Sequence, residues 1–135
     1  MKTTMTITFM TICICLGMLG CSPSVMTQSQ ALDMFNKVGG TEQANREARI
    51  IFDQFNGKES KEIFGNELTN FPTLSALGKP LFIQAGSNGY SSRIEIPIGS
   101  HYGRKFVFIF NPNEQIDFPY ASRCIQVTSN IFVGK

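Results

Sequence analysis

The sequence of 135 residues contains no tryptophan and a single histidine, His101. Histidine is the commonest metal ligand in proteins, so the chain is poor in such ligands. A zinc site needs three or four Cys, His or acidic ligands. Phosphate-binding loops and dinucleotide fingerprints are also absent, because Gly86 and Gly89 belong to a turn sequence. We therefore expect no metal and no other cofactor.

Neither basic nor acidic residues form a cluster anywhere in the sequence. The sequence has 12 basic and 10 acidic residues, and they are scattered. A domain that binds nucleic acid shows clustered Lys and Arg on one face. The charge pattern therefore excludes nucleic acid as a partner.

Cysteine is scarce outside the N-terminal region. Three of the four cysteines, Cys13, Cys15 and Cys21, lie within or at the end of an apolar N-terminal run. Cys124 is then the one cysteine of the remaining domain, so we expect no disulfide framework. It stands in a strand-like segment, where a cysteine usually behaves as a small buried hydrophobe. A reactive thiol would need basic groups around it, and the neighbouring Arg123 would lie on the opposite face of a strand.

The N-terminal run has the organisation of an export signal. Lys2 precedes an uncharged apolar stretch from Met5, which ends in Met18-Leu19-Gly20-Cys21 and is followed by polar residues. This ending resembles the lipobox of bacterial lipoproteins. The resemblance implies cleavage before Cys21, diacylation of Cys21, and sorting to the outer membrane because Ser22 rather than Asp follows. Acyl chains contribute ~0.8 kcal/mol per buried methylene, so several chains on one residue make a stable anchor.

Two other interpretations of this run stay open. An uncleaved transmembrane helix needs about 20 apolar residues, and Thr6, Thr8 and Thr11 weaken a run that is already short. A conventional signal peptide is cut at small residues of the A-x-A type, which are scarce here. The favoured organisation is a signal peptide over 1–20, a lipidated tether over 21–28, and a single domain over 29–135.

The first half of the domain is helical in pattern. Residues 29–38 place Leu32, Phe35 and Val38 at helical spacing. The following segment up to Gly57 has one continuous apolar stripe, formed by Ala44, Ala48, Ile51, Phe52 and Phe55. Residues 58–70 are ambiguous, and a short helix follows over 72–77.

The second half has the period of two that is typical of strands. Ile94, Ile96 and Ile98 lie on one face of an alternating segment, with Arg93 and Glu95 on the other. Residues 81–85, 104–110 and 123–133 are the other strand regions, and 104–110 is apolar on both faces, which favours a central position. The pattern predicts an α+β fold in two layers, with N-terminal helices on one face of a C-terminal antiparallel β-meander of about four strands.

One further resemblance concerns the middle of the chain. Leu77-Gly78-Lys79-Pro80 precedes the first strand, and Phe108-Ile109-Phe110-Asn111 precedes a polar turn. These motifs, within residues 69–116, are similar to those of small outer-membrane lipoproteins of the SmpA/OmlA type, also called BamE. The resemblance implies a role in the assembly of outer-membrane proteins.

Catalytic groups are few. Ser100 and His101 could form the centre of a small serine hydrolase, but adjacent residues rarely align a hydroxyl with an imidazole, and no Asp is near in sequence to orient the ring. We therefore expect a protein that is not an enzyme, and keep the hydrolase as an alternative.

The loops after the strands carry the residue types of binding surfaces, since Tyr and Arg are favoured at binding hot spots. The candidate surface consists of Ser100, His101, Tyr102, Arg104, Lys105, Phe118 and Tyr120. The leading hypothesis is a binding or scaffold module anchored to the outer membrane through the lipid on Cys21. It would face the periplasm and contact a protein of the cell envelope. A BamE-type assembly accessory is the second hypothesis.

Overall fold

The structure is a computed structural model that describes residues 25–99 and 105–134. Its helices are α2 (Gln28–Asn36), α3 (Gly40–Gln54) and α4 (Pro72–Leu77), with two 3-10 turns, η1 (Gly65–Asn70) and η2 (Ala121–Arg123). Its strands are β1 (Lys61–Ile63), β2 (Leu81–Gln84), β3 (Arg93–Ile98), β4 (Lys105–Phe110), β5 (Cys124–Thr128) and β6 (Ile131–Gly134).

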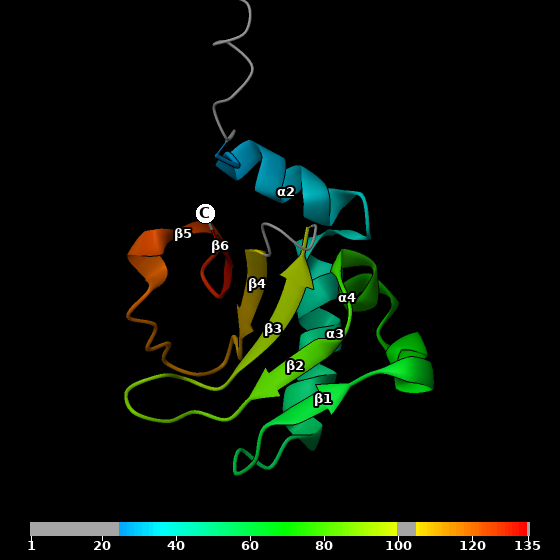
Figure 1. Ribbon diagram of the computed structural model, residues 1–135, viewed down its shortest axis with the longest axis vertical. Coiled ribbons are helices and arrows are strands. Elements are labelled where there is room, and N and C mark those ends of the chain that lie inside the picture. The colour runs from blue at the N-terminus through cyan, green and yellow to red at the C-terminus, as the bar shows by residue number, and fades with distance from the viewer. Residues whose placement is uncertain (1–24, 100–104, 135) are drawn as a thin grey trace, which may run out of the picture.

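The predicted α+β fold is confirmed. The strands form one sheet in the order β1-β2-β3-β4-β6-β5, and every neighbouring pair is antiparallel. Helices α3 and α4 lie behind this sheet in Figure 1. The strand over 105–110 is central, as its two apolar faces predict.

The described sheet has six strands, more than expected. Lys61–Ile63, in the ambiguous region, pairs with Ile83–Leu81 and forms one edge. The last predicted strand region folds back at residues 129 and 130 into β5 and β6, and β5 takes the other edge. Cys124, at the start of β5, is half-buried rather than fully buried.

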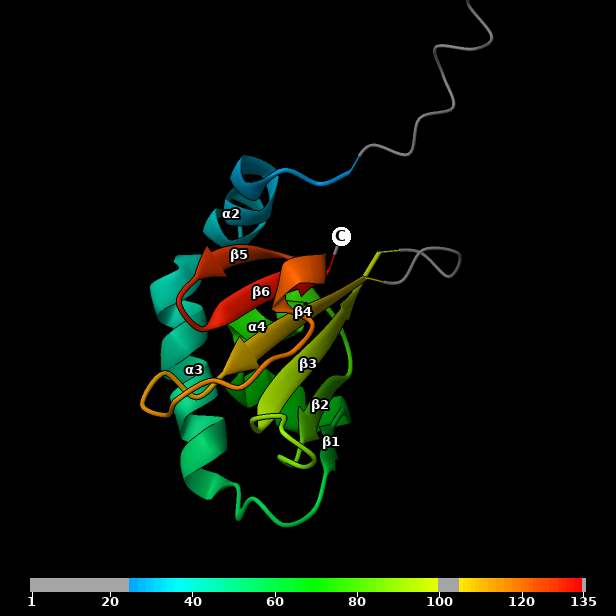
Figure 2. The same ribbon diagram turned by 90° about the vertical axis from the view of Figure 1, so that its left-hand side faces the viewer.

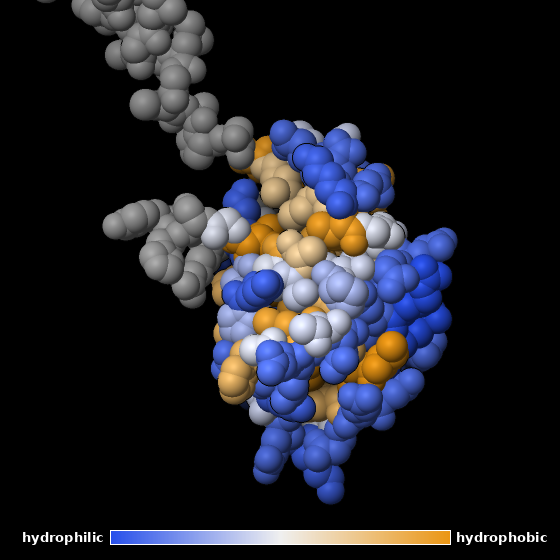
Figure 3. Space-filling view, turned by 90° about the vertical axis from the view of Figure 1, so that its right-hand side faces the viewer, coloured by the Kyte–Doolittle hydropathy of each residue, from blue (hydrophilic) through white to orange (hydrophobic). Residues whose placement is uncertain are grey.

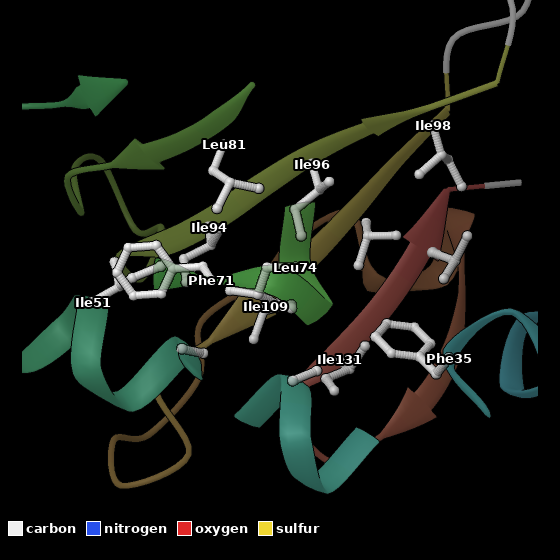
Figure 4. Packing of buried hydrophobic residues seen from close by; sticks show 14 of the residues in the cluster. Phe35, Ile51, Phe71, Leu74, Leu81, Ile94, Ile96, Ile98, Ile109 and Ile131 are labelled. Atoms are coloured by element: carbon white, nitrogen blue, oxygen red, sulfur yellow. The ribbon is translucent and has the colours of Figure 1, made fainter. Parts of the chain in front are cut away.

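The core lies between the sheet and the helices. Ile94, Ile96 and Ile109 are inaccessible to solvent, and Leu74 of α4 lies among them (Figure 4). The apolar stripe predicted for α3 faces the same core, with Ala44, Ala48, Ile51 and Phe52 buried and Phe55 half-buried. Each large aliphatic side chain buried in this way contributes about 1.5–3 kcal/mol.

Helix α2 lies across the β5 edge of the sheet (Figure 2). Thr27 is its N-cap and forms a capping box with Gln30, so the helix begins at the end of the predicted tether. Ala31 and Phe35 are buried, whereas Leu32 is 42% exposed. The helical spacing of Leu32 and Phe35 is confirmed, but only Phe35 of the two is buried, because a helix lying on a sheet edge buries only one narrow row of side chains.

A buried carboxylate joins α3 to α4. Glu47 is only 3% exposed. Its two carboxylate oxygens accept hydrogen bonds from the backbone N–H groups of Thr73 at 3.1 Å and Leu74 at 3.0 Å, in the first turn of α4. The preceding Pro72 has no N–H to satisfy, and the helix dipole favours an anion here. Glu47 thus caps α4 from another helix.

Gly78 lies where the chain leaves α4 and meets β3. A Cβ atom placed on Gly78 would overlap the carbonyl oxygen of Pro97. Only glycine therefore lets this turn approach the strand so closely.

Glu47→Gln keeps the shape of the side chain but leaves only one oxygen to accept the two N–H groups. We expect it to lower the free energy of unfolding by about 1–3 kcal/mol, the cost of a buried donor without an acceptor. Urea denaturation followed by circular dichroism measures this. The matched control is Asp53→Asn on the exposed side of α3, which should change stability by less than about 0.5 kcal/mol. Equal midpoints for the two variants would show that the Glu47 contacts do not stabilise the fold.

Candidate functional site

The face of the sheet opposite the helices carries aromatic and charged side chains. Alternation along β3 and β4 puts Arg93 and Glu95 on this face together with Phe106, Phe108 and Phe110. The register places Glu95 opposite Phe108 and Arg93 opposite Phe110. No helix in the described ranges covers these residues. We call this side of the sheet the second face, and only loops can shield it from solvent.

The segment between β4 and β5 covers part of the second face. The Phe118 ring lies 4.9 Å from the Phe110 ring, 5.2 Å from that of Phe108 and 5.4 Å from that of Phe132, measured between centroids. Such aromatic pairs each add about 0.5–1.5 kcal/mol beyond the burial of their area. Phe110 and Phe132 are buried in consequence, while Phe106 and Phe108 are only half-buried.

Two loops far apart in sequence are joined above this face. The Ser91 amide donates to the Asp117 carbonyl at 3.0 Å, and the Asp117 amide donates to the Ser91 hydroxyl at 2.7 Å. The same hydroxyl donates to the Gln115 carbonyl at 3.2 Å. Next to these bonds, the rings of Tyr90 and Tyr120 lie 5.7 Å apart. The β2–β3 loop and the segment 111–123 therefore form one arch.

Beside the arch the surface is hollowed, with a volume of about 670 Å³. This volume falls within the range of small-molecule binding sites. The aromatic lining comes from Tyr90, Phe106, Phe108, Phe118 and Tyr120. The polar lining comes from Lys58, Ser60, Gln84, Ser87, Asn88, Arg93 and Glu95. We call this cavity the aromatic hollow.

A charged pair lies in the wall of the aromatic hollow. The Nε atom of Arg93 donates to Oε1 of Glu95 at 2.7 Å, and the two side chains are only 19% and 18% exposed. The Arg93 guanidinium carbon also lies 5.5 Å from the centre of the Tyr90 ring. Within the described residues, the other guanidinium N–H groups and Oε2 of Glu95 have no further hydrogen-bond partner. The pair therefore offers donors and an acceptor side by side.

The contact between the two tyrosines changes the acidity of one of them. The hydrogen bond with Tyr120 raises the pKa of Tyr90, and loss of hydration raises it further. Both effects favour the neutral phenol. Tyr90 therefore remains uncharged next to Arg93 at neutral pH.

The predicted binding surface is brought together only in part. Phe118 and Tyr120 both line the aromatic hollow, and Tyr120 is 49% exposed. Lys105 is not among the lining residues, because it lies on the same face of β4 as the buried Val107 and Ile109. The other predicted positions, Ser100, His101, Tyr102, Arg104 and Cys21, lie outside the described residues.

The sequence interpretation missed Tyr90, Arg93, Glu95, Phe106 and Phe108 as parts of one site. The sequence does contain a signal for the strand residues: phenylalanine occurs at every second position, 106, 108 and 110, so the three side chains lie on one face of a strand. Combining the alternation of polar residues in 93–98 with the alternation of these phenylalanines would have predicted a sheet face that carries aromatic side chains. No local pattern predicts that Tyr90 meets Tyr120.

Elsewhere on the described surface, hydrophobic side chains are less clustered than in the aromatic hollow. Figure 3 shows one side of the molecule, on which hydrophobic side chains form several separate areas bordered by hydrophilic ones. A smaller cavity of about 280 Å³ lies between the end of α3 and β1, next to Ile51 and Phe55.

Over residues 25–99 and 105–134 there is no group of three His, Cys, Asp or Glu side chains that could hold a metal ion. Among these same residues, none of the helices has the length and apolar character to span a membrane.

The whole chain was compared with known proteins. It matches no protein-family model, no curated protein and no solved structure.

Proposed function

We propose that this chain is a lipid-anchored protein of the bacterial cell envelope whose domain is a binding module, not an enzyme. The aromatic hollow is the observation that carries the proposal. It combines five aromatic side chains with a charged pair whose other N–H groups and carboxylate oxygen have no hydrogen-bond partner among the described residues. Ligand sites combine aromatic side chains with placed polar groups that fix orientation, and the hollow has both kinds in its lining.

The anchor is the second part of the proposal, and its support is the lipobox-like ending at Cys21. Cys21 lies only a few residues before Thr27, the N-cap of α2. Because an extended chain spans at most ~3.3–3.6 Å per residue, the first helix would stay within about 20 Å of the lipid. We infer that the domain works close to the membrane surface, facing the periplasm if the lipoprotein is sorted to the outer membrane.

The other hypotheses remain predictions from the sequence. The serine hydrolase depends on Ser100 and His101, which lie outside the described residues. The BamE-type role in outer-membrane assembly depends on the resemblance around Leu77-Gly78-Lys79-Pro80. No contact among the described residues favours either function over ligand binding.

Replacing the lipidated residue tests the anchor. We expect the native chain in a bacterial host to incorporate radiolabelled palmitate and the Cys21→Ser variant to incorporate none, because serine cannot carry the lipid through a thioether. Cys124→Ser, which leaves the signal sequence intact, is the matched control and should be labelled like the native chain. A Cys21→Ser chain that is still labelled, or a native chain that is not, would contradict a lipid anchor at this residue.

Photocrosslinking in the living cell tests the binding module. The photoreactive amino acid p-benzoylphenylalanine is placed at Ser87, an exposed residue of the hollow's lining, and in a second variant at Asp53 on α3. Intact-mass analysis after illumination should show an added mass for the chain modified at 87 and none for the chain modified at 53. No adduct at 87, or equal adducts at both positions, would count against the aromatic hollow as the binding site.

A further inference from the structure

We propose that the ligand of the aromatic hollow is a sugar ring, that is, an uncharged ring with several hydroxyl groups and an apolar face. This inference rests on the proposed binding function and names the class of ligand. It follows from the two kinds of side chain that line the hollow, and from the ligands that each kind disfavours.

The charged pair matches neighbouring hydroxyl groups. Arg93 and Glu95 neutralise each other, so a charged ligand attracted by one would be repelled by the other. The guanidinium offers N–H donors directly beside the carboxylate acceptor. Each hydroxyl both donates and accepts, so two hydroxyls on adjacent ring carbons can satisfy both groups. Lys58 adds a positive charge only at the exposed rim, where salt screens it.

The aromatic side chains match the apolar face of such a ring. Phe106 and Phe108 stand next to each other on β4, with ring centroids 6.2 Å apart, and both are half-buried. The arch covers Phe110 through Phe118 but leaves these two rings in the lining of the hollow. The faces of aromatic rings are electron-rich, so they attract the slightly positive C–H groups on one side of a sugar.

An aliphatic ligand is disfavoured by the same pair. A fatty acyl chain in the hollow would displace water from the remaining N–H groups of Arg93 and from Oε2 of Glu95 without replacing its hydrogen bonds. Each such group left without a partner weakens binding, and the penalty is larger for charged groups.

An extended peptide is disfavoured by the shape of the site. Strands β3 and β4 lie inside the sheet and are paired on both sides, so neither offers a free edge. The rings of Tyr90 and Tyr120, which lie 5.7 Å apart, both belong to the lining of the hollow. A compact ligand fits this geometry better.

Calorimetric titration of the purified full chain tests the proposal. The detergent is lauryldimethylamine oxide, because a detergent with a sugar head could itself occupy the hollow. The ring probes are the disaccharide of N-acetylglucosamine, which is one of the two sugars of cell-wall glycan, and maltose, a free sugar without acetamide groups. Sorbitol is the open-chain control, and decanoate and decaproline represent the aliphatic and peptide classes. Tyrosine fluorescence gives a second readout, because the chain has no tryptophan and two of its three tyrosines line the hollow.

We expect at least one ring sugar to bind saturably and sorbitol to bind at least tenfold more weakly. The ring sugar that binds indicates whether cell-wall glycan or a free sugar is the source. Glu95→Gln should weaken binding at least tenfold without unfolding the chain, and Phe108→Ala should weaken it as well. Glu42→Gln, on an exposed position of α3, is the matched control and should leave affinity unchanged.

Three results would overturn the sugar proposal. They are no binding of either ring sugar, equal binding of sorbitol, and unchanged affinity in Glu95→Gln. Binding of decanoate or decaproline that Phe108→Ala abolishes would overturn the sugar class while supporting the hollow as a binding site. Failure of every probe together with the absence of an adduct at position 87 would overturn both proposals.

Discussion

The structure depends on one constraint: the sheet has two faces, and the helices of the described chain cover only one of them. Ile94, Ile96 and Ile109 fill the covered face and are fully buried. The opposite face carries Phe106 and Phe108, and only loops are available to cover it. Because the segment with Phe118 packs on the buried Phe110 and Phe132 and leaves Phe106 and Phe108 half-buried, the fold itself produces the aromatic hollow.

Buried polar contacts hold the two layers and the ends of the sheet in place. Glu47 fixes α4 to α3 through two backbone N–H groups. Asn130, in the turn between β5 and β6, donates to the side chain of Asn45 on α3 at 2.8 Å and to the carbonyl of Phe110 at 2.9 Å. These bonds tie the end of β4, the strand that carries Phe106 and Phe108, to the covered layer. A site on rigid strands positions its side chains more precisely than a site on loops alone.

The parts of the fold with a local period could be predicted from the sequence. The α3 stripe and the Ile94, Ile96 and Ile98 alternation follow from spacing, and the outward direction of Arg93 and Glu95 follows from the same alternation. The hydrogen bonds between Ser91 and Asp117 could not be predicted, since they depend on the path of two loops separated by a strand pair. Glu47 was missed for a related reason: its partners on α4 are 26 and 27 residues away, and no periodicity marks them.

Chemical-shift mapping by NMR tests the central claim most directly, because it locates a ligand on the chain residue by residue. The isotope-labelled full chain is titrated with the N-acetylglucosamine disaccharide and with maltose. The account predicts shift changes at Tyr90, Arg93, Glu95 and Phe108, with the buried stripe of α3 unchanged. Shift changes confined to the smaller cavity near Ile51 and Phe55, or none at all, would contradict the assignment of the second face as the binding site.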